Sequence, residues 1–277
     1  MHNIALTWQQ AAVLAVALST VAIALYQSGG RRARAVYRFA REAGVISGLY
    51  ALWQLAGSLS VLGTSGAFAR ARWIVRFERS VHLPSEASTQ RLVETHPLIV
   101  EACNIYYASM HFGVLFVFLL WLFLRHADQY RRIRLTLVLV TVTCLLVQLI
   151  PVAPPRLLPG FTDTAAQYGQ SVYSLGLAPD QLSAMPSVHV AWAVLIGWSV
   201  VRVSSSKWRW LVLAHPILTV LVVAATANHF WLDGGAAVAL LVGCVWSQRA
   251  ARWLAERRGP AQAAPAHVAV AQGRQVS

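Results

Sequence analysis

Apolar residues along this chain gather in long runs that polar or basic segments separate. Each run approaches or exceeds the roughly 18 apolar residues that suggest a bilayer span. The pattern therefore predicts an all-α fold, a polytopic transmembrane helical bundle of about seven spans. We expect these spans at residues 4–26, 45–62, 105–124, 135–152, 186–203, 208–227 and 229–246.

The same pattern divides the chain into four segments. Residues 1–62 are expected to form an N-terminal transmembrane hairpin, whose first run has no basic leader and reads as a retained span. Residues 63–104 mix aromatic and aliphatic side chains with arginines, which indicates an amphipathic segment lying in the interface. A transmembrane core follows at 105–250, and the Ala-, Gln- and Pro-rich residues 259–277 are expected to be disordered.

Basic residues concentrate in alternate connections between the predicted spans. They follow the first, third, fifth and seventh spans, whereas the intervening connections are poorer in them. Because Lys and Arg in short loops mark the cytoplasmic side, the N-terminus is expected outside and the C-terminus in the cytoplasm. The protein is thus expected to be an integral, multi-pass membrane protein, and we expect it in the plasma membrane. Residues 63–104 fit less well, since they carry Arg70, Arg72, Arg76, Arg79 and Arg91 on the outer side.

Composition agrees with a membrane protein and narrows its partners. Hydrophobic residues make up 57% of the chain and charged residues only 12%, against about 25% charged in soluble domains. The net charge of +13 belongs mainly to the loops, and no basic stripe is interleaved with stacking aromatics, so we expect membrane lipids and no nucleic acid as partners. Three scattered cysteines without a CxxC spacing predict no metal site, and we expect no cofactor.

One acidic residue lies within the apolar C-terminal part of the core. Asp233 is the only Asp or Glu between Asp180 and Glu256. A carboxylate in such a run is costly unless it is paired, so by default it marks a functional site. His229 lies four residues earlier, which would put both side chains on one face of a helix. The pair indicates a histidine that a carboxylate orients and makes basic.

Other reactive residues are expected at the same side of the membrane. The fourth span ends near Arg156, the fifth begins with Ser187 and His189, and the seventh begins with His229. Arginine matches phosphate oxygens, histidine can act as nucleophile or general acid, and a serine hydroxyl can donate to an anion. These residue types together indicate phosphoryl transfer without a metal.

The spacing of these residues resembles a known family. The P-S-x-H sequence at 186–189 followed by H-x-x-x-D at 229–233 resembles two motifs of the type 2 phosphatidic acid phosphatase superfamily. The A-P-P-R sequence at 153–156, with residues 104–107 and His111, is similar to its inositol-phosphorylceramide-synthase-like branch. The resemblance covers about residues 78–245 and implies a six-helix phosphatase-like core plus an interfacial helix.

The resemblance also implies roles for single residues. His229 would form a phosphohistidine, Asp233 would support it, and His189 would act as the acid, with Ser187 and Arg156 binding phosphate. Two positions depart from the wider superfamily. Arg156 stands outside the usual Lys-x6-Arg-Pro motif, and Val223 occupies the place of an arginine six residues before the motif histidine. Arg156 would then supply more of the positive charge that binds phosphate, and His111 would help to bind the substrate.

Each candidate also has a purely structural interpretation. The His229–Asp233 pair could join two helices, Arg156 could be an interfacial side chain that snorkels to water, and Ser187 could only cap a helix. His111 could be a core histidine, and Tyr106 and Tyr107 read best as anchors in the aromatic belt. For Glu78, His82 and Glu86 a solvated amphipathic face is favoured over a lid.

The leading functional hypothesis is a metal-independent lipid phosphatase or phosphotransferase with its active site on the extracytoplasmic side. Its substrate would be a lipid phosphate, and an alcohol such as inositol or a sugar would be the acceptor in transfer. The alternative is a proton-coupled transporter that uses the His and Asp side chains as a relay. An intramembrane serine protease is less consistent with the sequence, because Pro186 and Val188, not glycines, flank Ser187.

Overall fold

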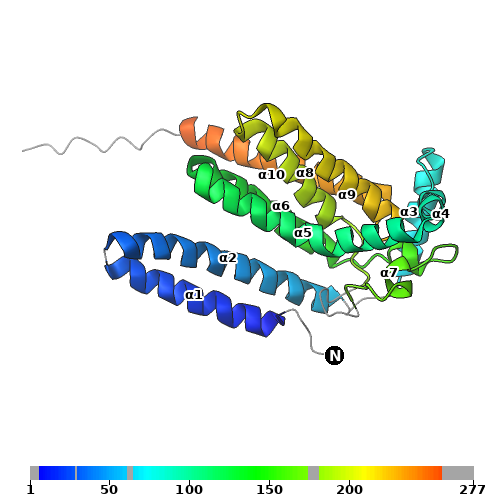
Figure 1. Ribbon diagram of the computed structural model, residues 1–277, viewed down its shortest axis with the longest axis horizontal. Coiled ribbons are helices and arrows are strands. Elements are labelled where there is room, and N and C mark those ends of the chain that lie inside the picture. Colours follow the sequence, from blue (N-terminus) through cyan, green and yellow to red (C-terminus); the bar gives the residue numbers. More distant parts are fainter. Residues whose placement is uncertain (1–5, 29, 61–64, 174–180, 258–277) are drawn as a thin grey trace, which may run out of the picture.

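The computed structural model describes residues 6–28, 30–60, 65–173 and 181–257, and these form an all-helical bundle (Figure 1). The only strand-like pairing within them is an isolated bridge between Val152 and Ser183. The all-α prediction is therefore confirmed for the described parts. The helices are α1 (Trp8–Ser28), α2 (Arg31–Ser60), α3 (Ala67–Ser80), α4 (Glu86–Glu94), α5 (Pro97–Arg125), α6 (Ala127–Gln148), η2 (Pro155–Leu157), α7 (Thr164–Gln167), α8 (Val188–Val203), η3 (Lys207–Leu213), α9 (Ala214–Ala225) and α10 (Trp231–Arg257).

Three helical stretches among the described residues are long and apolar enough to cross a membrane: α1, α5 and the continuous η3–α9 stretch. These stretches mark the chain as a membrane protein. The helices do not stop where the apolar runs stop. For example, α2 begins at Arg31 and α10 continues to Arg257, because arginine and glutamate are good helix formers and allow a helix to continue into the charged region. The tail at 259–277 lies outside the described residues.

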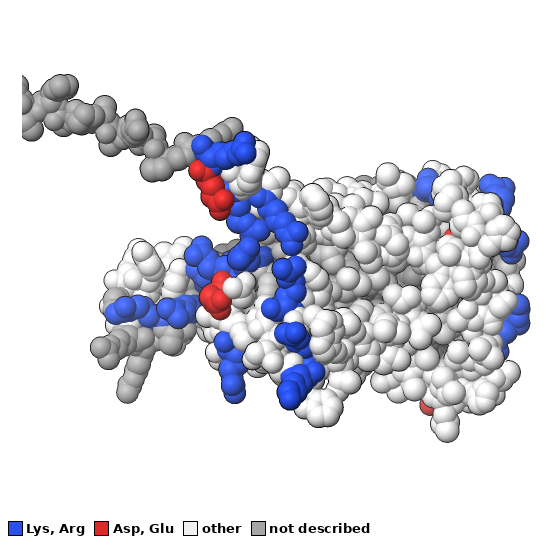
Figure 2. Space-filling model, turned by 90° about the horizontal axis from the view of Figure 1, so that it is seen from above, with Lys and Arg blue, Asp and Glu red and all other residues white. Residues whose placement is uncertain are grey.

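The basic connections gather at one end of the bundle. The α1–α2 and α5–α6 turns, the α8–η3 turn and the C-terminal part of α10 all lie at the same end (Figure 1). Figure 2 shows Lys and Arg at the two ends of the molecule and a broad uncharged surface between them. Successive connections along the chain thus lie at alternate ends of the bundle, and the basic turns named above share one end.

The N-terminal hairpin of α1 and α2 packs mainly on itself. It meets the core through ring contacts of Tyr50 and Trp53 with Phe112 of α5 and through one buried carboxylate. Glu42 of α2 is 5% exposed. It accepts a hydrogen bond of 3.0 Å from the Tyr130 hydroxyl and forms ion pairs with Arg134 of α6 and with Arg41. The core itself is formed by α5, α6, α8, α9 and α10 around buried aliphatic side chains.

Helices α3 and α4 lie across the end of the bundle opposite the basic turns (Figure 1). The exposed Trp73 and Phe77 of α3 stack with ring centroids 5.5 Å apart, in keeping with an amphipathic helix. The expected solvated face is wrong for two residues, because Glu78 and Glu86 are only 2% and 4% exposed. Both carboxyl groups face the start of α10, and nothing in the sequence pattern indicated a partner for them there.

The N-terminus of α10 explains this burial. The first backbone N–H groups of a helix have no partner within the helix. Here Leu232 N–H donates to Glu78 Oε1 at 2.7 Å and Trp231 N–H to Glu86 Oε1 at 3.3 Å. Carboxylates are also favoured at this position by the helix dipole. Helices α3 and α4 therefore hold the first turn of α10 in place.

Glu78 should make stability depend on pH. Burial, and next the neighbouring Glu86 carboxyl, raise the pKa of Glu78 from 4.5 to about 9. Between these two pH values the folded protein keeps a proton that the unfolded chain has lost, so stability falls as pH rises, by at most about 1.4 kcal/mol per pH unit. We expect the thermal midpoint of the purified protein to fall from pH 5 to 9.

The Glu78→Gln variant should flatten this dependence, because a glutamine oxygen can still accept the Leu232 N–H but does not titrate. Glu256→Gln, at an exposed position of α10, serves as the matched control and should keep the wild-type slope. Equal slopes in wild type and Glu78→Gln would show that Glu78 does not retain its proton.

Candidate active site

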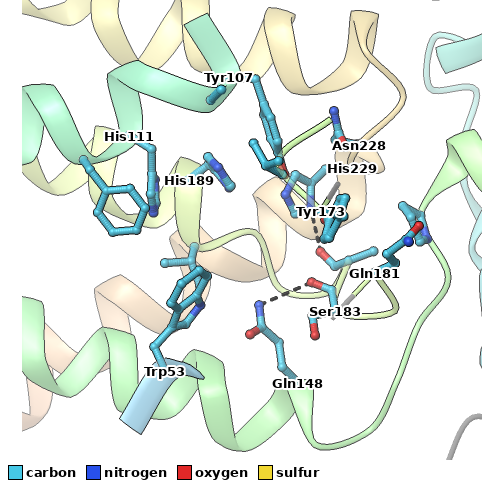
Figure 3. Close-up of a pocket in the computed structure, with 16 residues that line it drawn as sticks. Trp53, Tyr107, His111, Gln148, Tyr173, Gln181, Ser183, His189, Asn228 and His229 are labelled. Carbon is cyan, nitrogen blue, oxygen red and sulfur yellow. Dashed lines mark hydrogen bonds between the residues drawn. The ribbon is translucent and has the colours of Figure 1, made fainter. Parts of the chain in front are cut away.

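Three histidines from three parts of the chain line one small cavity of about 120 Å³. His111 comes from α5, His189 from the first turn of α8 and His229 from the loop that precedes α10 (Figure 3). Trp53 of α2 and Gln148 at the end of α6 line the same cavity. The sequence predicted that His189 and His229 would meet and that His111 would help to bind the substrate, and the structure places all three side chains around this cavity.

The three imidazole rings form a row. The ring centroids of His111 and His189 are 4.0 Å apart, and those of His189 and His229 are 5.6 Å apart. Aromatic rings hold this row from the side, since Tyr107 stacks on His189 at 4.4 Å and Trp192 stacks on His111 at 4.2 Å. The ring contacts restrict how each imidazole can turn.

His229 is oriented by two acceptors. Its Nδ1 lies 2.7 Å from the backbone oxygen of Ala184 and 3.4 Å from Asp233 Oδ2. A carbonyl oxygen can only accept, so Nδ1 must carry the proton that it donates. In the neutral ring this leaves the lone pair on Nε2, which is therefore the nitrogen available for chemistry.

Asp233 reaches His229 by a route that differs from the expected one. α10 begins at Trp231, so His229 precedes the helix and does not share a helical face with Asp233. The two side chains meet across the first turn instead. Asp233 is fully buried, and its Oδ2 also accepts the Phe230 N–H at 2.9 Å, whereas its Oδ1 has no hydrogen-bond partner. The carboxylate thus holds both the helix start and the histidine.

Ser187 caps α8. It is fully buried, and its Oγ accepts a hydrogen bond of 3.3 Å from Val190 N–H. Its own N–H donates to the backbone oxygen of Asp233 at 3.2 Å. Ser187 does not line the histidine cavity, so in this structure it joins the starts of α8 and α10.

Arg156 lies one layer behind the cavity. Its side chain is only 2% exposed and pairs with Asp163, Nε to Oδ2, at 3.1 Å. Its guanidinium carbon lies 4.7 Å from the ring centre of Tyr173, which itself lines the cavity. Nη1 has no hydrogen-bond partner. The burial does not fit a side chain that snorkels to water, and the free Nη1 leaves the guanidinium with a donor to offer.

Sequence reasoning missed several residues that shape the cavity. Tyr107 was interpreted as an anchor at the membrane surface, but it is 8% exposed and stacks on His189. Gln148 donates to the backbone oxygen of Pro186 at 3.0 Å, and Tyr173 and Gln181 complete the polar wall. Two signals could have found Tyr107: it stands four residues before His111, and it belongs to residues 104–107, which resemble the same family branch.

The described residues that line the cavity include histidines, amides and tyrosines but no Lys or Arg. No group of three His, Cys, Asp or Glu side chains in the described parts is arranged to hold a metal ion. The arrangement offers one free imidazole nitrogen on His229, a second imidazole beside it, and neutral hydrogen-bond donors around both. Such a set can attack an electrophile and protonate a leaving group.

Comparison with known proteins gives one result. A model of the PAP2 superfamily matches residues 72–247, from α3 to α10. No curated protein and no solved structure gives a significant match. The matched segment contains His111, His189, His229 and Asp233 and leaves the α1–α2 hairpin outside. Because the match spans well over half of the chain, the protein belongs to the PAP2 superfamily, whose members are of the phosphatase type.

Proposed function

We propose that this protein is a lipid phosphatase or phosphotransferase that works through a phosphohistidine on His229, without a metal. The observation that carries the proposal is the fixed orientation of His229, whose Nδ1 is engaged by Ala184 and Asp233 while Nε2 is left free beside His189. Membership of the PAP2 superfamily supports the phosphatase type of chemistry.

The reaction has two steps. His229 Nε2 attacks the phosphorus of a phosphate ester, and the bond from phosphorus to the ester oxygen breaks as the N–P bond forms. His189, protonated, gives its proton to the leaving oxygen, and the Asp233 carboxylate stabilises the positive charge on His229. Water or an alcohol then loses a proton to His189 and attacks phosphorus, which restores His229.

An apolar cavity supports a lipid as the substrate. It has a volume of about 380 Å³ and lies between the α1–α2 hairpin and helices α5, α6 and α8. Trp53 and Phe112 line both this cavity and the histidine cavity, so the two spaces adjoin. A phosphate in the histidine cavity could thus have its apolar chain in the neighbouring space. Contacts with Trp53 would then help to bind the chain.

The placement of charge supports an extracytoplasmic active site. His189 and His229 lie at the end of the bundle opposite the basic turns. If the basic turns face the cytoplasm, the C-terminus is cytoplasmic, the N-terminus is outside, and the site opens on the outer side, in the plasma membrane by our proposal. The proton-coupled transporter has no described feature in its favour, since these two histidines lie together at one end of the bundle.

Phosphatase and phosphotransferase differ only in what attacks the phosphohistidine. The A-P-P-R motif and His111 resemble the inositol-phosphorylceramide-synthase-like branch, which favours an alcohol such as inositol or a sugar as acceptor. His111 lies at 4.0 Å from His189, where it could contact a substrate in the cavity. The unpartnered Nη1 of Arg156 would support the phosphate from the layer behind the cavity. Ser187, predicted to bind phosphate, would act indirectly by holding the starts of α8 and α10.

The direct test is turnover of a panel of lipid phosphates and phosphodiesters by the purified protein with a chelator present, with and without inositol or sugars. His229→Ala should lower turnover at least about 1000-fold, because it removes the nucleophile, and His189→Ala about 100- to 10,000-fold. His82→Asn, at an exposed position with a positive φ of 58° that asparagine tolerates, is the control. Full activity in His229→Ala would remove the proposed nucleophile.

The Asp233→Asn variant should separate the contribution of the negative charge to turnover from its contribution to the fold. Asparagine can still accept the Phe230 N–H, and the Ala184 oxygen still holds the Nδ1 proton of His229. We therefore expect a loss of about 100-fold in kcat, from the missing negative charge, with a nearly unchanged thermal midpoint. A loss as large as that of His229→Ala would mean that Asp233, and not Ala184, sets the ring orientation.

Trp53→Ala should weaken the binding of long lipid chains. Removing the indole from the apolar cavity should raise KM for a long-chain lipid phosphate about tenfold and should raise KM for a short-chain substrate less, because Trp53 only partly lines the histidine cavity. The matched control is Trp246→Ala, which changes a tryptophan that is 66% exposed. An equal effect on short and long chains would contradict the assignment of this cavity to the lipid chain.

A further inference from the structure

A second polar cavity lies at the opposite end of the bundle from the histidines. Its volume is about 390 Å³, and helices α6, α8 and α10 form its walls together with the α5–α6 turn. The described lining includes polar or charged side chains from each of these elements. The phosphoryl-transfer mechanism proposed above does not use any of them.

Four arginines from three helices converge on this cavity. Arg132 belongs to α6, Arg202 to α8, and Arg249 and Arg252 to α10. None of the four makes an ion pair with an acidic side chain in the described parts of the chain. The one acidic lining residue, Asp128, is fully exposed and accepts a hydrogen bond from Gln129. The cavity therefore carries excess positive charge, and His126 adds a titratable group.

A buried hydroxyl also faces this cavity without a partner. Ser199 of α8 lines it, is 1% exposed, and its Oγ makes no hydrogen bond. The neighbouring Gln248 is already engaged, because its Nε2 donates to Thr136 Oγ1 at 2.8 Å and to the Cys244 oxygen at 3.2 Å. A buried polar group without a partner is costly, and an anion in the cavity would give Ser199 an acceptor.

A topological role alone does not account for these features. Arginines that only mark the cytoplasmic side need to reach water and headgroups, and they need neither a shared cavity nor a buried hydroxyl. Arg131 and Arg125 lie at the same end of the bundle and do not line the cavity. These two arginines are therefore examples of basic residues in this chain that only lie at the end of the bundle and belong to no such cavity.

We propose that this cavity is a second binding site, distinct from the histidine cavity, that takes the phosphate group of an anionic ligand. Guanidinium groups match phosphate oxygens with paired hydrogen bonds, and the convergence of three helices lets one ligand bridge α6, α8 and α10. The phosphate can belong to a phospholipid headgroup or to a soluble phosphate. The apolar Ile133, Val203 and Val245 in the lining offer contacts for the glycerol and upper chain of a lipid.

The test uses the purified full-length protein in neutral detergent and has two arms. One arm titrates phosphatidylglycerol against phosphatidylcholine in mixed micelles, and the other titrates inorganic phosphate. Binding is read as a rise in the thermal midpoint and as bound mass in native mass spectrometry. Both arms are repeated in His229→Ala, so that a phosphohistidine in the histidine cavity does not contribute.

The variants separate the cavity from general surface charge. We expect the Arg202→Gln/Arg249→Gln protein to lose at least tenfold in apparent affinity and Ser199→Ala to lose a few-fold. The charge-matched control Arg125→Gln/Arg131→Gln should bind like the wild type. A response to phosphatidylglycerol alone identifies a lipid headgroup, and a response to inorganic phosphate identifies a soluble anion. Equal losses in both double variants, or no response in either arm, would overturn the proposal.

Discussion

The start of α10 is the point on which the histidine-lined end of this protein depends. An α-helix that begins inside a protein presents N–H groups that water cannot reach. Three carboxyl groups meet this need here: Glu78 from α3, Glu86 from α4 and Asp233 from α10 itself. Because Asp233 also contacts His229, the requirement to satisfy a helix terminus and the requirement to orient a reactive histidine are fulfilled by the same group.

This arrangement connects helix α3 to the histidines that line the cavity. The amphipathic α3 presents aromatic and basic side chains outward, while Glu78 reaches inward to the first turn of α10. The Ser187 N–H ties α8 to the same turn through the Asp233 backbone oxygen. His189 of α8 and His229 of the loop before α10 are therefore held by the same helical turn. Ring contacts with Tyr107 and Trp192 further restrict His189 and His111.

The sequence predicted the positions of the helices well and the contacts between distant residues less well. Apolar runs located the main helices, and alternate basic loops predicted which helix ends share one end of the bundle, since both signals are local. His189, His229 and Asp233 were found because ionisable groups stand out in apolar surroundings. The burial of Glu78 and Glu86 could not be predicted, because their partners are backbone N–H groups about 150 residues away. The pairing of Arg156 with Asp163 was missed for another reason: the two residues are only seven apart but lie in an irregular segment, where no helical period indicates which side chains meet.

The acceptor that fixes the His229 ring has a consequence for how this site can vary. The oxygen belongs to the main chain of Ala184, so no side-chain substitution removes it. Ala184 is 3% exposed and its N–H is bonded to the Val152 oxygen, which leaves little room for a larger side chain. Natural selection would then act at position 184 on volume, not on chemical function. Ala184 carries no reactive group, so a search for catalytic side chains would not find it. Its main-chain oxygen would nevertheless decide which imidazole nitrogen of His229 faces the substrate.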